Sequence, residues 1–444
     1  MKSCTRRLLG LAISTVAVVA VGSAVAGGPC DIYQAAGTPC VAAHSTVRAL
    51  YAAYSGNLYQ VRRASDKTTK DIGLVSTGGI ANSAVQDSFC AKTTCTISKI
   101  YDQSSKANHL VVTPPGGWLG HGGTEATATA AKIKLNGYPV YGVYTTGSFD
   151  TAVGGVGYRN NKTSGVATGD QPEAIYMVMD GKHYNQYCCF DYGNAETDNT
   201  DDGSGTMEAV FFGNSTQWGK GSGNGPWVMA DLENGLFAGQ SFAAPATNIS
   251  MTSAYVTGMV KGNSGNSWAI KGGDASSGSL ATLYTGVRPT GYNPMKKEGA
   301  IILGTGGDNS HTGQGTFFEG CMVSGFPSDA TDNAVQANIV AAGYGSTTTA
   351  IAGVSAPSDP SVSMRSDFRD ATTTVAYSLK GSSRVLFRSV DLEGREVARI
   401  VDGVVPPGFH EAVWDTRQTH AGVYVLSMEI DGRQVWSGNV LVGR

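Results

Sequence analysis

From residue 27 to about residue 345, apolar and aromatic residues occur in short runs that glycine, asparagine, serine and threonine interrupt. Short runs of this kind, separated by turn residues, are typical of β-strands. The clearest strands are predicted at 174–180, 208–213, 226–233, 299–307 and 315–326. Helical spacing of apolar residues is weak except in segments 43–54 and 332–344. The pattern therefore predicts an all-β sandwich or barrel.

Residues 1–26 have the composition of a cleaved secretory signal peptide. A basic start is followed by an apolar run over residues 8–23 and by small residues ending at Ala26. The run is short for a membrane span, and no second hydrophobic stretch follows it. We expect the mature chain to be secreted, extracellular or at the cell surface, where disulfides persist. A net charge of −3 without a basic run argues against a nucleic-acid partner.

A change of composition divides the chain near its C-terminal end. Residues 346–361 have the serine-, threonine- and proline-rich composition of a linker. Beyond the linker the chain is more highly charged, with 21 charged residues among positions 355–444, and apolar residues alternate with polar ones. Residues 362–444 are predicted to form a second, small β-sandwich of Ig-like size. Residues 27–345 are predicted to form one larger β-domain.

The cysteines imply disulfides but not all of the pairings. Seven remain beyond the predicted signal: Cys30, Cys40, Cys90, Cys95, Cys188, Cys189 and Cys321. Seven is an odd number, so at least one is unpaired within the chain. Adjacent Cα atoms lie about 3.8 Å apart, whereas ordinary disulfides join Cα atoms about 4.4–6.8 Å apart. Cys188 and Cys189 therefore either bond each other under strain or have distant partners. No cysteine or histidine pair has zinc-site spacing, and we predict no metal.

Two acidic positions are candidates for catalysis. Strand alternation over residues 227–233 places Asp231 and Glu233 on one face, together with Trp227 and Met229. This face could be the floor of a polar cleft, or a solvent-exposed face whose acids keep the protein soluble. Asp308 follows an apolar strand directly, in the turn Gly-Gly-Asp-Asn. It could be a catalytic group on a loop, or an aspartate that bonds its own turn.

Glycoside hydrolysis fits two carboxylates in a secreted β-protein, since it needs one acid and one base or nucleophile. Glu319 is a further carboxylate without distinguishing context. A non-catalytic carbohydrate-binding sandwich would carry a similar polar and aromatic surface. No cofactor is implied, because positioned carboxylates and water are sufficient for this reaction.

Residues 28–345 contain a series of long, unusual motifs. They are, in order, GPCDIYQAAGTPCVAAHSTVRALYAAYSGNLYQV, KIYDQSSKANHL, YRNNKTSGVATGD, HYNQYCCFDYGNAET, GPWVMADLENGLF, GYNPMKKEGAIILG, GGDNS and FPSDATDNAVQANIVAAGY. Together these motifs resemble the catalytic domain of glycoside hydrolase family 54. This family contains secreted α-L-arabinofuranosidases of the arabinofuranosidase B type, and the resemblance implies a concanavalin-like β-sandwich. It also implies retaining removal of terminal, non-reducing α-L-arabinofuranosyl residues from arabinan and arabinoxylan. Some relatives also release xylose, so a bifunctional arabinofuranosidase and β-xylosidase is an alternative.

The resemblance also assigns residues. It implies that Glu233 is the nucleophile and Asp308 the acid/base. The substrate-binding positions that it implies are Asp231, Asn234, Gly235, Gly307, Trp218, Cys188 and Cys189. The disulfides that it implies are Cys30–Cys40, Cys90–Cys95 and Cys188–Cys189, and Cys321 is then expected to be a buried free thiol.

The C-terminal segment departs from the family, whose fungal members carry an arabinose-binding β-trefoil. Residues 362–444 instead resemble the Ig-like sorting modules of bacterial enzymes, including cargo of type IX secretion. The expected partners are therefore plant cell-wall polysaccharide and, through this segment, the secretion machinery or the cell surface. A plain spacer domain is the alternative for this segment.

Overall fold

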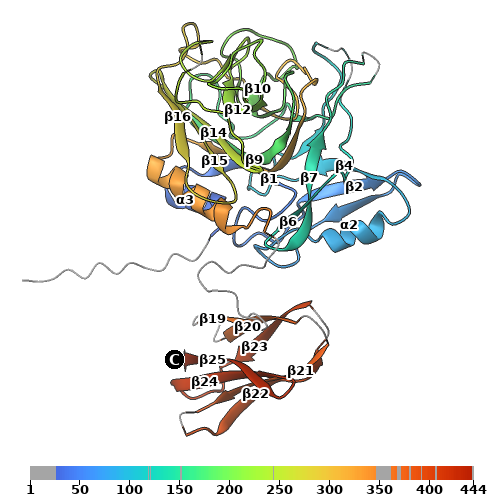
Figure 1. Ribbon diagram of the computed structural model, residues 1–444, viewed down its shortest axis with the longest axis vertical. Coiled ribbons are helices and arrows are strands. Elements are labelled where there is room, and N and C mark those ends of the chain that lie inside the picture. The colour runs from blue at the N-terminus through green and yellow to red at the C-terminus, as the bar shows by residue number, and fades with distance from the viewer. Residues whose placement is uncertain are drawn as a thin grey trace, which may run out of the picture. The chain divides into compact units, whose positions relative to one another are not determined.

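The structure is a computed structural model that describes most of two compact units, Met1–Ala350 and Ile351–Arg444 (Figure 1). It describes residues 27–346 apart from 119, 121, 151, 152 and 244, and residues 362–442 apart from 368–371, 380, 381, 392, 406 and 407. The predicted signal peptide and nearly all of the predicted linker lie outside the described residues. Within the described ranges, no helix has both the length and the apolar character needed to cross a bilayer.

Two large antiparallel sheets make up the first unit. The eight-stranded sheet has the order β16-β15-β14-β9-β18-β7-β6, with β1 paired to β18. Its strands are β1 (Cys40–Ser45), β6 (Ala131–Leu135), β7 (Tyr138–Thr145), β9 (Glu173–Tyr184), β14 (Tyr255–Asn263), β15 (Ser267–Asp274), β16 (Ala281–Gly286) and β18 (Gly315–Ser324). The ten-stranded sheet has the order β13-β12-β11-β10-β17-β8-β5-β4-β2-β3. Its strands are β2 (Tyr59–Arg63), β3 (Thr69–Ile72), β4 (Cys95–Ile100), β5 (Leu110–Val112), β8 (Tyr158–Asn160), β10 (Asp191–Ala195), β11 (Glu208–Gly213), β12 (Trp227–Asp231), β13 (Leu236–Phe237) and β17 (Ala300–Leu303). A strand is present in each of the five segments for which the sequence predicted one most clearly, namely β9, β11, β12, β17 and β18.

The two sheets pack face to face around one apolar core. Gly258 of β14 shows the contact: a Cβ there would lie 3.0 Å from Val228 Cγ1 and 3.1 Å from Val210 Cγ1, both of the other sheet. Glycine allows this close approach because it has no Cβ. Val210, Val228 and Met179 are fully buried in the shared core. The arrangement is a sandwich, as the sequence pattern predicted.

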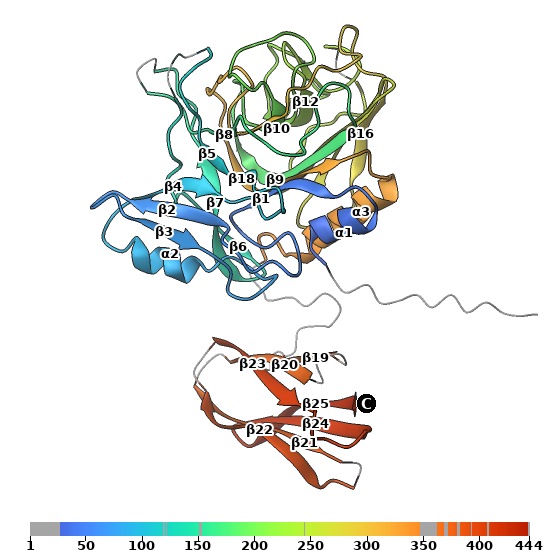
Figure 2. The same cartoon turned by 180° about the vertical axis from the view of Figure 1, so that it is seen from behind.

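Three helices are described in the first unit, and only one of them follows the sequence prediction. They are α1 (Pro29–Ala35), α2 (Ser83–Phe89) and α3 (Asp329–Ala341), and α1 lies beside α3 (Figure 2). Helix α3 confirms the helical spacing at 332–344, although it begins earlier because Ser328 caps it by accepting a hydrogen bond from Thr331 N–H. The helix expected at 43–54 is wrong. Residues 40–45 form β1, which is buried along its whole length against β18.

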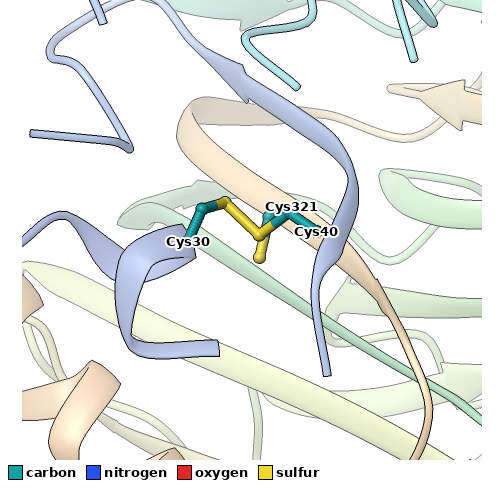
Figure 3. A group of neighbouring side chains, drawn as sticks. All are labelled: Cys30, Cys40 and Cys321. Carbon is teal, nitrogen blue, oxygen red and sulfur yellow. A yellow bond between two sulfur atoms is a disulfide. The ribbon is translucent and has the colours of Figure 1, made fainter. Parts of the chain in front are cut away.

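The described cysteines form three disulfides: Cys30–Cys40, Cys90–Cys95 and Cys188–Cys189. Cys321 is a free, fully buried thiol, as expected from the sequence. Its sulfur lies beside the Cys30–Cys40 disulfide (Figure 3), and the three sulfur atoms lie within 4.8 Å of one another. The pairing of β1 with β18 accounts for this proximity, since Ala43 stands opposite Cys321.

The second unit has two sheets of its own. A three-stranded sheet contains β19 (Val362–Asp367), β20 (Thr372–Leu379) and β23 (Gly408–Asp415). A four-stranded sheet contains β21 (Ser383–Val390), β22 (Glu396–Val405), β24 (Gly422–Ile430) and β25 (Arg433–Val442). Val375, Phe387, Trp414 and Leu426 are buried in one core drawn from both sheets. The alternating pattern of the sequence therefore corresponds to a small two-sheet unit.

Candidate active site

A cavity of about 390 Å³ in the first unit brings together all the binding and catalytic candidates named from the sequence. The candidates that line it are Cys188, Cys189, Trp218, Asp231, Glu233, Asn234, Gly235, Gly307 and Asp308. These residues come from four separate stretches of the chain. Three of the stretches adjoin the ends of β10, β12 and β17, which lie within a few strands of one another in one sheet, and Trp218 lies in the segment between β11 and β12.

Glu233 is placed by a tight turn at the end of β12. The strand ends at Asp231, and Glu233 and Asn234 follow with positive φ angles of 62° and 58° before β13 begins. Asp231 Oδ1 accepts a hydrogen bond of 3.1 Å from the Glu233 N–H. Tyr292 donates its hydroxyl to the Glu233 carbonyl at 2.9 Å. Side chain and backbone bonds thus fix the turn that presents the Glu233 carboxyl to the cavity.

The expected polar floor along residues 227–233 is corrected in two respects. Alternation stops at Asp231, so a turn and not the strand face orients Glu233. Trp227 and Met229 do lie on the opposite face from Val228, but both are buried, with Leu236 and Ala238 packed over them. The chain that follows β12 covers this face, which is why the face is apolar rather than open to solvent.

Asp308 lies in the turn after β17, where it both bonds its own turn and lines the cavity. Its Oδ1 accepts a 2.8 Å hydrogen bond from Ser310 N–H, as a turn aspartate does. Its half-buried side chain also lines the cavity. Gly307 lies next to the carboxyl groups of Glu196 and Glu233. A Cβ on Gly307 would collide with Glu196 Oε2 and lie 3.0 Å from Glu233 Oε2. Only glycine leaves room for these carboxyl groups at this position.

A buried arginine holds the Asp308 turn. Arg159 of β8 donates through Nη1 to the Gly307 carbonyl at 2.7 Å and to Asn309 Oδ1 at 3.0 Å. Through Nη2 it donates to the carbonyl of Glu196. Burial lowers the pKa of Arg159 to about 10, so the guanidinium keeps its charge at neutral pH. A cation therefore lies directly behind the acidic turn.

Four carboxyl groups crowd this part of the sheet. Burial, before any other cause, raises the pKa of Glu196 and of Asp231 to about 7. Burial and then the charges of Asp231 and Glu196 raise the pKa of Glu233 well above its usual range. Asp191 of β10 is fully buried beside Asp231, and its pKa is raised in the same way. Because the groups repel one another when charged, the cluster retains protons at mildly acidic pH.

The Cys188–Cys189 disulfide forms an apolar part of the cavity wall. Sγ of Cys189 and Sγ of Cys188 lie 3.4 Å and 3.8 Å from Asp231 Oδ2. The Cys188 carbonyl accepts a 3.0 Å bond from Thr312 N–H, which ties the disulfide to the segment after Asp308. Trp218 lines the same cavity with 44% of its surface exposed. The two sulfurs also lie near Asp191, but disulfide sulfurs are not the thiolates that bind metals.

Glu319 does not line the cavity. It is fully buried and forms an ion pair with Arg48, with Nε–Oε2 at 2.5 Å and Nη2–Oε1 at 2.6 Å. Sequence reasoning also missed functional candidates: the buried Arg159 and Glu196, and Trp118 on the cavity rim. The scarcity of glutamate could have drawn attention to Glu196, because residues 30–345 contain only seven glutamates.

Comparison with known proteins identifies the family. A family profile described as "Alpha-L-arabinofuranosidase B, catalytic" matches residues 29–345. The chain belongs to this family. It is 59% identical over 338 residues to a probable alpha-L-arabinofuranosidase B of Aspergillus terreus, a match that covers 75% of this chain and 65% of the relative. It is 54% identical over 382 residues to the alpha-L-arabinofuranosidase B of Aspergillus oryzae, covering 84% and 72%.

Solved structures agree with the family assignment. A crystal structure of an arabinofuranosidase complexed with arabinofuranosyl-alpha-1,2-xylobiose matches with a TM-score of 0.69 and 50% identity, covering 80% of this chain and 73% of that one.

A further relative by sequence is an arabinofuranosidase/β-xylosidase of Trichoderma koningii. It is 59% identical over 332 residues, covering 73% of this chain and 65% of the relative. The chain thus spans about two thirds of the length of several family relatives.

Proposed function

We propose that this protein is a retaining exo-acting α-L-arabinofuranosidase that removes terminal, non-reducing arabinofuranosyl residues from arabinan or arabinoxylan. The observation that carries the proposal is that Glu233 and Asp308 line one cavity, with the Glu233 carboxyl next to Gly307 and Asp308 following Gly307 in the chain, in a protein that belongs to the arabinofuranosidase B family. Two carboxyl groups facing one sugar site are what glycoside hydrolysis requires, and retention is the outcome that the family resemblance implies.

Glu233 is assigned the role of nucleophile and Asp308 that of acid/base. Glu233 attacks the anomeric carbon, the bond to the glycosidic oxygen breaks, and Asp308 gives its proton to that departing oxygen. Water then attacks the same carbon while Asp308 accepts the water proton, and Glu233 is released. Asp231, Asn234 and the backbone at Gly235 and Gly307 are assigned to binding the arabinose. The Cys188–Cys189 disulfide and Trp218 are assigned to its two apolar sides.

Glu233 must be ionised in order to attack. Glu196 and Asp231 have pKa values of about 7, so each is largely neutral at mildly acidic pH. Burial is the largest cause of the raised pKa of Glu233, and the charges of Asp231 and Glu196 come next. The neutral forms of these two neighbours therefore remove part of what raises the pKa of Glu233.

The decisive experiment is arabinose release from 4-nitrophenyl α-L-arabinofuranoside, with proton NMR of the first product anomer. We expect release with retention by the wild type and a loss of at least about a thousandfold in Glu233→Gln. Full activity in Glu233→Gln would remove its role, and inversion would remove the covalent step. Xylose release from a β-xyloside tests the second activity, which the Trichoderma koningii relative suggests.

The remaining assignments concern location and fold type. We propose that residues 1–26 direct secretion and that the second unit, of Ig-like type, attaches the enzyme to the secretion machinery or the cell surface. We also propose that the first unit is of the concanavalin-like type. Recovery of the enzyme in culture fractions, with and without the second unit, tests the proposal about location.

A further inference from the structure

Three aromatic side chains on the cavity rim have no part in the mechanism described above. Trp118, Phe149 and Tyr187 line the cavity, with 62%, 61% and 40% of their surfaces exposed. Large aromatic residues exposed together around a cavity commonly mark a binding surface. We call these three residues the aromatic rim.

Trp118 is fastened to the backbone of the acid/base residue. The backbone N–H of Trp118 donates a hydrogen bond of 2.8 Å to the Asp308 carbonyl. A Cβ on the preceding Gly117 would collide with that same carbonyl and with the carbonyl of Asn199. Asn309, next to Asp308, donates through Nδ2 to the carbonyls of Pro114 and Gly116 at 3.1 Å and 2.9 Å. The segment that carries Trp118 therefore moves with the turn that carries Asp308.

This attachment determines which part of the substrate Trp118 faces. A general acid must reach the oxygen that it protonates, within hydrogen-bond distance. That oxygen joins the arabinose to the sugar that leaves with it. The leaving sugar must therefore lie on the Asp308 side of the cavity, where Trp118 is fixed. Phe149 and Tyr187 extend the same rim, with ring centroids 4.7 Å apart and planes nearly perpendicular.

We propose that the aromatic rim is the aglycone subsite, in which Trp118 stacks on the main-chain sugar of the polysaccharide that carries the arabinofuranose. This inference rests on the proposed function. Aromatic faces bind the C–H faces of sugar rings by dispersion and weak C–H contacts. Among the described residues that line the cavity, the ionisable side chains with a carboxyl group are Asp201, Asp231, Glu233 and Asp308, and no lysine, arginine or histidine is present to pair with an acidic sugar. The subsite therefore suits a neutral sugar, such as a xylose or arabinose residue of the polymer, and repels uronic acids.

The test compares a substrate that fills the subsite with one that leaves it empty. Release of arabinose is measured from arabinofuranosyl-α-1,2-xylobiose and from methyl α-L-arabinofuranoside. In Trp118→Ala, the ratio of kcat/KM on the first substrate to that on the second should fall about tenfold, and Trp118→Tyr should restore most of it. Both variants keep the backbone N–H that bonds Asp308. Val75→Ala is the control, because Val75 is an apolar side chain that is 58% exposed and does not line the cavity.

Other outcomes overturn the proposal in distinguishable ways. An equal loss on both substrates would make Trp118 a support for Asp308 alone, and an unchanged ratio would remove it from binding. An unchanged ratio with an altered molecular mass in light scattering would assign the rim to contact between protein chains. No arabinose release by the wild type from either substrate would overturn the proposed function itself. Transfer of arabinose to added xylobiose, relative to water, gives a second readout, which we expect Trp118→Ala to lower.

Discussion

Arg159 Nη1 donates a hydrogen bond of 2.7 Å to the carbonyl oxygen of Gly307, which joins β8 to the turn that carries Asp308. The same guanidinium bonds Asn309 on the far side of Asp308, so two neighbours of the proposed acid/base residue share one donor group. The guanidinium is almost completely buried, and its fork matches acceptors that a lysine ammonium could reach only one at a time. Arg159 therefore holds the turn that carries the proposed acid/base residue.

Replacing Arg159 by lysine keeps the positive charge but removes the planar guanidinium, which bonds the Gly307 carbonyl and Asn309 at the same time. We expect Arg159→Lys to lower kcat on arabinofuranosides by about 10- to 100-fold, because a small displacement of the acid slows proton transfer. KM should change less than kcat. Arg62→Lys is the control, since Arg62 forms a partly exposed ion pair with Glu125 on another part of the unit. Activity of Arg159→Lys within twofold of the wild type would show that the turn holds its own geometry.

Adding a single methyl group at Gly307 should disable the site. The new Cβ would collide with Glu196 Oε2 and press on Glu233 Oε2, and the Gly307 backbone is fixed by Arg159. We expect Gly307→Ala to lose at least about a hundredfold in kcat/KM while its circular dichroism stays that of a folded protein. Gly73→Ala is the control, because the nearest atom to a Cβ there lies 3.5 Å away. Near-normal activity in Gly307→Ala would mean that the carboxyls have room to move.

The buried Glu196 should make stability depend on pH. Its pKa is raised from 4.5 to about 7 in the folded protein, chiefly by burial. Between these two values the unfolded chain releases the proton while the folded protein keeps it, so the free energy of unfolding falls as pH rises. Above pH 7 the accumulated loss is about 3 kcal/mol.

Glu196→Gln removes this proton and can still accept from Thr206, which now donates to Glu196 Oε1. We expect urea unfolding of the variant at pH 4.5 and pH 7.5 to show a smaller decline in stability than the wild type. Asp198→Asn, at an exposed carboxyl two residues further along, should leave the decline unchanged. An identical decline in wild type and Glu196→Gln would place the pH dependence elsewhere, for example in the buried Glu173.

The Cys188–Cys189 disulfide should matter more for binding than for stability. It closes a loop of two residues, which restrains the unfolded chain very little. Its sulfurs instead lie against Asp231 in the cavity. The Cys188→Ala/Cys189→Ala double variant should raise KM by about tenfold and leave the free energy of unfolding within about 1 kcal/mol. The Cys90→Ala/Cys95→Ala variant removes a disulfide that does not line the cavity, and it should leave KM unchanged.

Local sequence patterns predicted most of the strands because the order of apolar and polar residues within a strand reflects which of its side chains are buried. In β24, alternation between core and solvent is visible in the residues themselves. Segment 43–54 misled for a physical reason: its apolar residues have helical spacing, yet partners nearly 280 residues away in β18 determine that Cys40–Ser45 is a strand.

The sequence predicted those site residues that lie within a long, recognisable motif. Glu233 and Asp308 lie in motifs long enough to identify, and the structure brings them to one cavity. Arg159 could not be assigned in this way, because the residues that give it a role lie 37 and 148 positions away. The same holds for Trp118, which no local pattern connects with Asp308.

Cys321 gives the first unit a built-in reporter of unfolding. The thiol of this β18 residue is fully buried beside the Cys30–Cys40 disulfide, and burial raises its pKa well above the usual range. A maleimide can therefore label it only when the sheet opens and the thiol ionises in water. The labelling rate under native conditions then measures how often β1 separates from β18, without any introduced probe.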